Sequence, residues 1–146
     1  MAGHLVLITG ATGLIGFKTL ALLLQAGYTV RAAVRTQAGF DQIASSRPVQ
    51  PYRAQLSSFI VPDITVPGAY DEAVRGVKYI VHVASPIPKA KEGSDYDSCF
   101  IRPAVQGTVG ILESALKAGG VAKVVITASL SSIASSERSA SPEIIN

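Results

Sequence analysis

A loop of three evenly spaced glycines stands between a short apolar segment and a longer amphipathic one near the start of the sequence. The loop reads Gly10-Ala-Thr-Gly13-Leu-Ile-Gly16. Residues 4–9 before it (HLVLIT) are short and almost entirely apolar, which is typical of a strand buried on both faces. Residues 14–26 after it carry apolar side chains at helical spacing and precede a glycine, a usual helix end. The sequence therefore predicts a strand, a tight turn and a helix in direct succession.

Each glycine of this loop has a different predicted role. Gly10 lets the chain turn sharply, Gly13 lacks a Cβ so that a pyrophosphate can approach the backbone, and Gly16 lets the helix pack against the strand. The helix N-terminus offers unpaired N–H groups and a positive dipole end to phosphates. A second predicted strand, residues 29–34, ends about 20 residues later, as a dinucleotide-binding fingerprint requires. Residues 5–35 are thus predicted to bind a dinucleotide pyrophosphate; the alternative is a glycine-rich turn without a ligand.

Apolar and amphipathic segments continue to alternate along the chain. Further strands are predicted at residues 59–62, 79–84 and 123–127, helices at 40–46, 69–75 and 96–118 (kinked or restarted at Pro103), and loops at 47–52, 86–93 and 129–142. Apolar strands separated by helices require a sheet that is covered on both faces. The predicted fold class is therefore α/β, a doubly wound parallel sheet of the Rossmann type with strand order 3-2-1-4-5. Ligands in this architecture bind at the carboxyl ends of the strands.

Composition restricts the compartment and the partners. The chain has 146 residues, of which 48% are hydrophobic and 16% charged, so a single domain with a filled core is expected. The net charge is +3, but the basic residues are scattered, so no nucleic-acid partner is expected. Cys99 is the only cysteine, and no uncharged apolar run is long enough to cross a bilayer. A cytoplasmic protein without a membrane partner is predicted.

The end of the second strand distinguishes between the two nicotinamide dinucleotides. An NAD site usually has an acidic residue there, and an NADP site has an arginine nearby. Residues 30–35 read VRAAVR, and the first acid after them is Asp41. Arg35 is predicted to pair with the 2′-phosphate, the alternative being a solvent-facing side chain. The sequence favours NADP(H) over NAD(H).

Five motifs in this order resemble those of the extended short-chain dehydrogenase/reductases, within the NAD-dependent epimerase/dehydratase superfamily. They are GATGLIG, VRAAVR, VPDI, VHVASP and VVITAS. The nearest resemblance is to the dihydroflavonol reductase-like branch, which includes fungal and yeast NADPH-dependent ketone and aldehyde reductases. The resemblance implies an oxidoreductase that acts on a small-molecule carbonyl substrate. It implies cofactor contacts at Gly10, Thr12, Gly13, Leu14, Ile15, Gly16, Arg35, Asp63, Ile64, Val83, Ala84, Ser85 and Thr127.

The resemblance also assigns particular roles. Asp63 and Ile64 would contact the adenine, with Asp63 accepting from the exocyclic amine; a turn or helix-cap role is the alternative for Asp63. Residues 83–85 would pass beneath the nicotinamide-side ribose, with plain strand packing as the alternative for Val83. Ser129 corresponds to the catalytic serine, which would hold the substrate carbonyl oxygen. Its alternative is to cap or solvate a serine-rich loop.

The same resemblance implies a Tyr-x-x-x-Lys pair, in which the tyrosine protonates the carbonyl oxygen and the lysine lowers the tyrosine pKa. None of the five tyrosines has a lysine four residues later. Residues 1–146 are therefore expected to be an incomplete NAD(P)-binding domain of a carbonyl reductase, truncated after the fifth strand. Two alternatives stay open. One is a non-catalytic dinucleotide-binding or redox-sensing module, and the other is a chain that does not fold stably because its sheet edge is exposed.

Three further reactive side chains are given structural interpretations. His4 and His82 lie in apolar strand segments and are predicted to be packed core residues. Cys99 lies in a predicted helix without a matching histidine, so a role as nucleophile is not expected.

Overall fold

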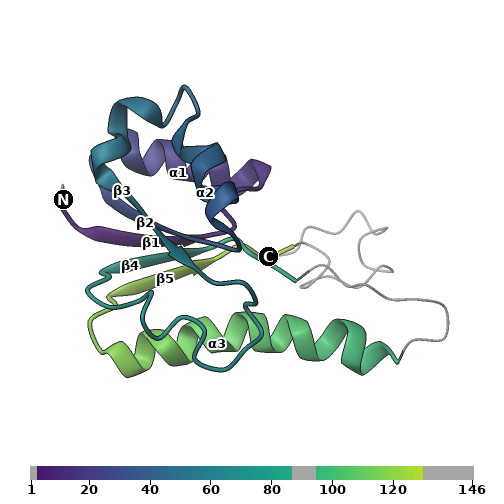
Figure 1. Ribbon diagram of the computed structural model, residues 1–146. Coiled ribbons are helices and arrows are strands. Elements are labelled where there is room, and N and C mark those ends of the chain that lie inside the picture. Colours follow the sequence, from purple (N-terminus) through teal and green to yellow (C-terminus); the bar gives the residue numbers. More distant parts are fainter. Residues whose placement is uncertain (1–2, 87–94, 130–146) are drawn as a thin grey trace, which may run out of the picture.

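The structure is a computed structural model, and it describes residues 3–86 and 95–129. Five parallel strands form one sheet in the order β3-β2-β1-β4-β5, with helices on both of its faces (Figure 1). The strands are β1 (Leu5–Thr9), β2 (Thr29–Val34), β3 (Leu56–Ile60), β4 (Tyr79–His82) and β5 (Lys123–Ile126). The helices are α1 (Leu14–Gln25), α2 (Gln37–Ala44) and α3 (Arg102–Ala118), with a 3₁₀ helix at Gln50–Gln55 and a π-helical turn at Asp97–Ile101. The predicted fold class and strand order are confirmed.

Two buried clusters hold the layers together, one on each face of the sheet. Helices α1 and α2 cover one face, while α3 and the connection between β3 and β4 cover the other (Figure 1). Leu20 and Leu24 of α1 belong to the first cluster. Ile111 of α3 and Tyr70 of the connection belong to the second. Because both faces are covered, the central strand β1 is buried along nearly its whole length, as its continuous apolar sequence predicted.

The predicted third strand was placed three residues too late. Residues 59–62 were expected, but β3 begins at Leu56, and Val30 to Val34 of β2 pair in register with Leu56 to Ile60. The polar residues Ser57 and Ser58 obscured this start. They are tolerated because β3 is an edge strand in which Ser57 is exposed and Ser58 only partly buried.

Two other local predictions were wrong. Residues 47–52 were predicted as a loop, yet Gln50–Gln55 form a 3₁₀ helix with a proline in its first turn. Residues 69–75 were predicted as a helix, yet they form a series of turns. The guanidinium Nη1 of Arg31 donates to the carbonyl oxygens of Ala73 and Arg75 at 2.7 and 2.9 Å, so these carbonyls are satisfied without a helix.

The predicted long helix from residue 96 to 118 is confirmed as a π-helical turn that leads directly into α3. Pro103 lies in the first turn of α3 and has no N–H to donate to the Cys99 carbonyl four residues earlier. The wider π turn before it is a backbone geometry that accommodates this loss. Helix α3 ends at Gly119, whose φ of 69° is the left-handed conformation expected at a helix end.

The two histidines differ from each other. His82 is buried, with 2% of its surface exposed, which confirms its predicted place in the core. The same prediction is wrong for His4, which is exposed because it precedes β1 at the open amino end of the sheet. Its ring meets that of Tyr79 edge to face at 5.7 Å.

Candidate cofactor site

A cleft of about 530 Å³ lies at the carboxyl ends of β1, β2 and β4. This is where the chain leaves β1 toward α1 on one face of the sheet and leaves β4 toward α3 on the other (Figure 1). All of the predicted cofactor contacts line this cleft except Asp63 and Thr127. The structure thus brings together residues from four separated segments of the sequence. Their contact with a cofactor stays a prediction.

Five lining residues were not singled out from the sequence: Thr9, Ala33, Val34, Val61 and Tyr70. Four of them lie in the last two residues of a strand or directly follow one, so the rule that ligands bind at carboxyl strand ends would have found them. Tyr70 lies in the turns between β3 and β4, and only the tertiary fold brings it to the cleft.

The backbone geometry of the loop supports distinct roles for its glycines. Gly10 has a φ of 70°, and a Cβ there would lie 2.8 Å from the backbone nitrogen of Ala84. A Cβ on Gly16 would lie 2.1 Å from the carbonyl oxygen of Gly10. The predicted turn at Gly10 and close packing at Gly16 are therefore confirmed. At Gly13 the nearest protein atom would be 3.5 Å away, so the protein itself leaves room for a methyl group.

The amino end of α1 faces the same cleft. Gly13 is its N-cap residue and contributes no side-chain cap, while Leu14, Ile15 and Gly16 line the cleft. The N–H groups of a first helical turn have no partner inside the helix, and the helix dipole is positive at this end. This part of the cleft can therefore receive an anionic group.

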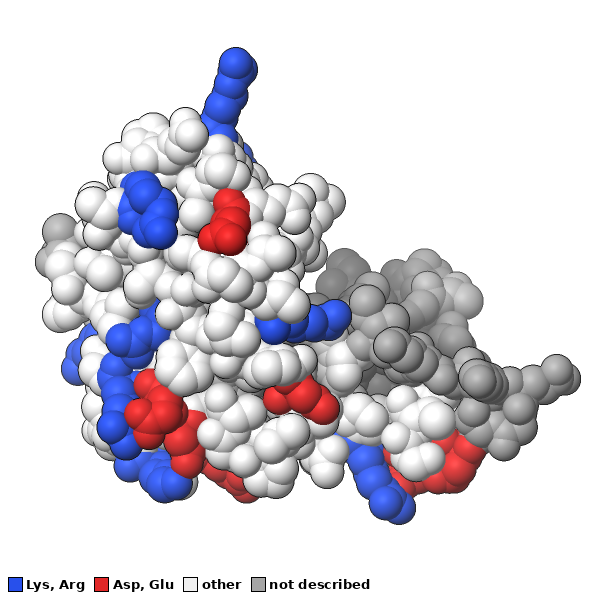
Figure 2. Space-filling model, in the orientation of Figure 1, with Lys and Arg blue, Asp and Glu red and all other residues white. Residues whose placement is uncertain are grey.

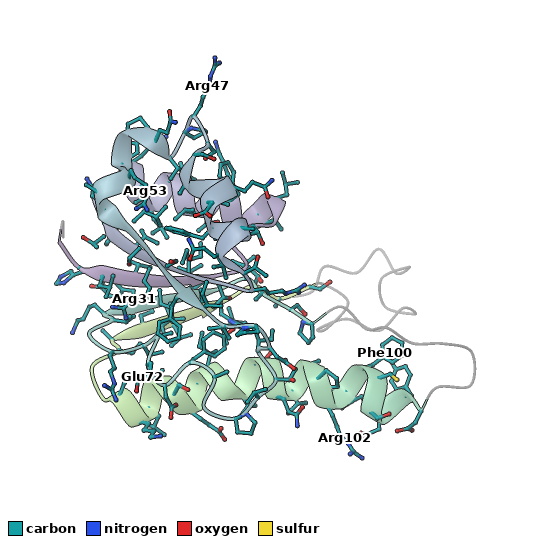
Figure 3. The ribbon with its side chains drawn as sticks, in the orientation of Figure 1. Arg31, Arg47, Arg53, Glu72, Phe100 and Arg102 are labelled. Carbon is teal, nitrogen blue, oxygen red and sulfur yellow. The ribbon has the colours of Figure 1, made fainter. Side chains whose placement is uncertain are left out.

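Arg35 is the only arginine among the described residues that lines the cleft. Arg31 is held by two backbone carbonyls, and the guanidinium of Arg53 lies 5.1 Å from the centre of the Phe40 ring. Arg47 projects away from the body of the protein (Figure 3). Arg35 is exposed, so its charge is available to a second anionic group at the rim.

Asp63 has the turn role that was one of its two sequence interpretations. Its Oδ1 accepts from the backbone N–H of Thr65 at 2.8 Å and from the Thr65 hydroxyl at 2.7 Å. These hydrogen bonds, together with the charge of Arg35, lower the pKa of the Asp63 carboxyl. A contact between this exposed carboxylate and adenine stays a prediction.

The end of β4 is fixed by a side chain that the sequence did not indicate. The hydroxyl of Thr9 accepts from the backbone N–H groups of Val83 and Ala84, at 3.1 and 3.0 Å. The same hydroxyl lies 2.9 Å from Nδ1 of His82. Because Val83 and Ala84 line the cleft, the Thr9 hydroxyl fixes the position of the cleft wall that these two residues form.

Nearly the whole chain matches the model of a known protein family. The model of the NAD dependent epimerase/dehydratase family matches residues 6–144. The chain belongs to this family. The family resemblance predicted from the five motifs is confirmed, and the glycine loop, Arg35 and the β4 end all fall within the matched range.

Relatives within the epimerase/dehydratase family include fungal proteins. The chain is 42% identical over 134 residues to the ketoreductase CTB6 of Cercospora nicotianae, with 89% of this chain and 38% of the relative covered. It is 46% identical over 135 residues to the NAD-dependent epimerase/dehydratase ALT6 of Alternaria alternata, with the same two shares. The chain therefore spans 38% of the length of these relatives.

A solved structure with the same arrangement contains a cofactor. Yeast methylglyoxal/isovaleraldehyde reductase Gre2, complexed with NADPH, is 30% identical and superposes with a TM-score of 0.74. The match covers 86% of this chain and 37% of the yeast chain. At this level of identity the likeness supports the family assignment as well as the fold.

The two residues expected after β5 lie outside the cleft lining. The backbone N–H of Thr127 donates to the His82 carbonyl at 3.0 Å, which extends the pairing of β5 with β4. Ser129 is exposed and is the last residue that the structure describes. The catalytic role that the family resemblance implies for Ser129 stays a prediction. Most of the predicted loops at residues 86–93 and 129–142 lies outside the described residues.

The described residues contain neither a cluster of metal ligands nor a membrane-spanning helix. No group of three or more His, Cys, Asp or Glu side chains there is placed to hold a metal ion. None of the helices there has the length and apolar character needed to cross a membrane. On the face shown in Figure 2, several basic side chains lie together at the lower left with acidic side chains beside them, and the other basic side chains stand apart.

Proposed function

We propose that residues 1–146 are the NADP(H)-binding portion of a reductase that acts on the carbonyl group of a small molecule. The observation that carries this proposal is the cleft at the carboxyl strand ends, which joins the amino end of α1 to Arg35. The family assignment supports it, as do a ketoreductase among the relatives and a reductase complexed with NADPH among the solved structures.

The residues present fit a dinucleotide that carries three phosphates. The pyrophosphate would lie on the amino end of α1, over Gly13, where the protein leaves room beside the backbone. Arg35 would pair with the 2′-phosphate at the end of β2. Among the described residues no aspartate or glutamate lines the cleft, so the acid that would hold an unphosphorylated ribose is not at hand. The donor set therefore favours NADP(H) over NAD(H).

The remaining wall would contact the adenine at one end and hold the nicotinamide half at the other. Ile64 would contact the adenine, and Val83, Ala84 and Ser85 would support the ribose on the nicotinamide side. When bound, the nicotinamide supplies the hydride for reduction. Ser129 would hold the carbonyl oxygen that receives negative charge. A general acid is still required, and residues 1–146 contain no Tyr-x-x-x-Lys pair, so the proposal assigns this role to a part of the longer protein outside these residues.

The proposal that the domain continues has support from the surface of the described residues. Strand β5 is at an edge of the sheet, and its Val125 is 50% exposed. Leu116 on the outer side of α3 is 83% exposed. Apolar side chains on an edge strand and its covering helix are normally buried by further elements. Sequencing the transcript downstream tests this proposal: a genuine stop codon after Asn146 without a Tyr-x-x-x-Lys segment downstream would contradict it.

Calorimetric titration of the 146-residue chain with NADPH and NADH tests the binding proposal. We expect tighter binding of NADPH, and Arg35→Ala should reduce that preference by about tenfold, the equivalent of ~1.4 kcal/mol. Arg47→Ala is the matched control, because Arg47 projects away from the body of the protein (Figure 3) and does not line the cleft. Equal affinity of the wild-type chain for both dinucleotides would contradict the role of Arg35. No binding to a folded chain would overturn the cofactor site.

A second function is a dinucleotide-binding or redox-sensing module without catalysis. The observation that favours it is a formed cleft in a chain that lacks the Tyr-x-x-x-Lys pair. Assays of NADPH oxidation with a panel of ketones and aldehydes separate the two functions when applied to the chain and to its longer transcript product. Turnover by residues 1–146 alone would contradict the view that the general acid is absent.

We also propose a cytosolic location. A single cysteine suits a reducing compartment, since no disulfide can form within the chain. Fractionation of cells that express a tagged chain tests this, and recovery in a secreted or membrane fraction would contradict it.

A further inference from the structure

The hydroxyl group of Thr9 has three polar neighbours, and their chemistry settles the direction of each hydrogen bond. A hydroxyl has one proton to donate and two lone pairs that accept. The N–H groups of Val83 and Ala84 can only donate, so they occupy both lone pairs, at 3.1 and 3.0 Å. The proton of the hydroxyl must therefore point to Nδ1 of His82 at 2.9 Å. It follows that Nδ1 carries no proton and that the neutral ring carries its proton on Nε2.

This hydroxyl stands at the point where the sheet ends. Thr9 and His82 are register partners at the last position of the β1–β4 pairing. Beyond His82 the chain leaves the ladder, and the next two N–H groups need acceptors that β1 no longer offers. The Thr9 side chain supplies the acceptor for both. Val83 and Ala84 are thereby held on the wall of the cleft.

The wall has little freedom to move elsewhere. A Cβ on Gly10 would lie 2.8 Å from the nitrogen of Ala84 and 3.0 Å from the carbonyl carbon of Val83. The glycine loop and the β4 end therefore touch backbone to backbone. A shift of the β4 end would displace the loop that is proposed to hold the pyrophosphate.

A histidine at position 82 buries a polar ring nitrogen without a hydrogen-bond partner among the described residues, which lowers stability in a way that an apolar residue would avoid. Its ring is buried beside Tyr70, with the two rings edge to face at 6.2 Å. Among the described residues neither His82 Nε2 nor the Tyr70 hydroxyl has a hydrogen-bond partner. Leaving a buried donor unpaired is unfavourable, so the ring needs a compensating role. Among the interactions of this ring with described residues, the hydrogen bond that it accepts from the Thr9 hydroxyl is the one that neither a leucine nor a phenylalanine would provide.

We propose that Thr9 and His82 are positioning residues for the cofactor. Nδ1 of the neutral His82 ring accepts a hydrogen bond from the Thr9 hydroxyl. This orients both lone pairs of the hydroxyl toward the N–H groups of Val83 and Ala84, which would lie beneath the bound dinucleotide. The proposal rests on the proposed function for its ligand. Its structural part, the tautomer and the fixed β4 end, does not depend on that ligand.

The structural part is tested first, on the wild-type chain without cofactor. Nitrogen-15 NMR should give His82 a deprotonated Nδ1 and a protonated Nε2 at pH 7.5. Amide exchange at Val83 and Ala84 should be slow, and it should quicken in Thr9→Val but not in Thr9→Ser. A proton on Nδ1, or exchange that is equally fast in all three proteins, would overturn the proposal whether or not the chain binds NADPH.

The functional part is tested by NADPH affinity. Thr9→Val has nearly the same shape but neither accepts nor donates, and we expect the dissociation constant to rise about tenfold. Thr9→Ser should stay within about twofold of wild type, because it keeps the hydroxyl. His82→Leu should weaken binding as Thr9→Val does, whereas His82→Asn, whose Oδ1 stands in for Nδ1, should bind more tightly than His82→Leu. The Thr9→Val/His82→Leu double variant should bind no more weakly than Thr9→Val, since both changes remove one coupled unit.

Ser114→Ala is the matched control. Ser114 is a buried hydroxyl on α3 that donates to Asp71 at 2.8 Å and does not line the cleft. We expect it to lower the melting temperature and leave the NADPH affinity unchanged. Wild-type affinity in folded Thr9→Val, or an equal loss in Ser114→Ala, would overturn the positioning role. If the wild-type chain itself fails to bind NADPH, the proposed function fails, and the tautomer and exchange measurements still decide the structural part.

Discussion

The carbonyl oxygen of Gly10 lies only 2.1 Å from the place where a Cβ on Gly16 would stand. Two residues six positions apart therefore share a space that no side chain can enter. The contact joins the start of the glycine loop, directly after β1, to the first turn of α1, and so limits how far this helix can lie from β1.

Replacement of Gly16 by alanine is expected to destabilise the fold. The added methyl group would meet backbone rather than a movable side chain, so the helix has to shift away from the loop. Overpacking of this kind costs about 1–3 kcal/mol. Urea unfolding followed by circular dichroism measures the loss. An unchanged unfolding midpoint would show that α1 can move without cost.

Replacement of Gly13 by alanine should have the opposite profile. The nearest protein atom would be 3.5 Å from the new Cβ, an ordinary contact, so we expect a change in stability below about 1 kcal/mol. The methyl group would instead stand where the pyrophosphate is proposed to approach, and NADPH affinity should fall at least tenfold. Wild-type affinity in this variant would rule out a close approach of the pyrophosphate at Gly13.

Replacement of Tyr70 by phenylalanine should leave the protein as stable as before or make it more stable. The Tyr70 hydroxyl is buried without a hydrogen-bond partner among the described residues, and burial raises the pKa of its phenol. Removing an unpaired buried polar group relieves a penalty of about 1–3 kcal/mol while the ring keeps its packing. Thermal melting compares the two proteins. A clear loss of stability would mean that the hydroxyl makes an interaction in solution.

The stability of the fold should depend on pH through His82. Burial lowers the pKa of this ring below its usual value of 6.5. As the pH falls below 6.5, the unfolded chain therefore takes up a proton that the folded chain does not, and the free energy of unfolding decreases. Above that pH both states are neutral and this stability is fully present.

Melting temperatures between pH 8 and pH 5 measure this dependence, with His82→Asn as the comparison. The asparagine variant has no group that titrates at this position, so its stability should decline less over the same range. Parallel pH profiles in the two proteins would contradict the buried neutral ring.

Much of the fold could be predicted from the sequence because its strongest signals are local. The segment from β1 through the glycine loop to α1 combines a buried strand, a turn that needs glycine and a helix, all within about one supersecondary unit. The alternation of strands and helices then restricts the topology to a few forms. These signals led to the strand order, and to a set of cofactor residues most of which meet in one cleft.

Two of the wrong predictions, the start of β3 and the helix at residues 69–75, share a physical cause, which is that tertiary contacts override local pattern. Ser57 and Ser58 look like loop residues, yet pairing with β2 makes them part of β3. Residues 69–75 have helical spacing, yet Arg31 from β2 binds the carbonyls there. The Thr9–His82 hydrogen bond joins residues 73 positions apart, so no local sequence pattern predicts it.

The cleft draws its lining from both buried clusters, since Val34 belongs to the cluster under α1 and α2, while Val61 and Tyr70 belong to the one under α3. A dinucleotide bound there would contact residues of both clusters and so stabilise the packing on both faces of the sheet. At a hundredfold excess over its dissociation constant, such a ligand adds about 2.7 kcal/mol to the free energy of unfolding. The fraction of this polypeptide that stays folded in a cell would then rise and fall with the concentration of the dinucleotide. The abundance of the polypeptide would therefore depend on the metabolic state of the cell.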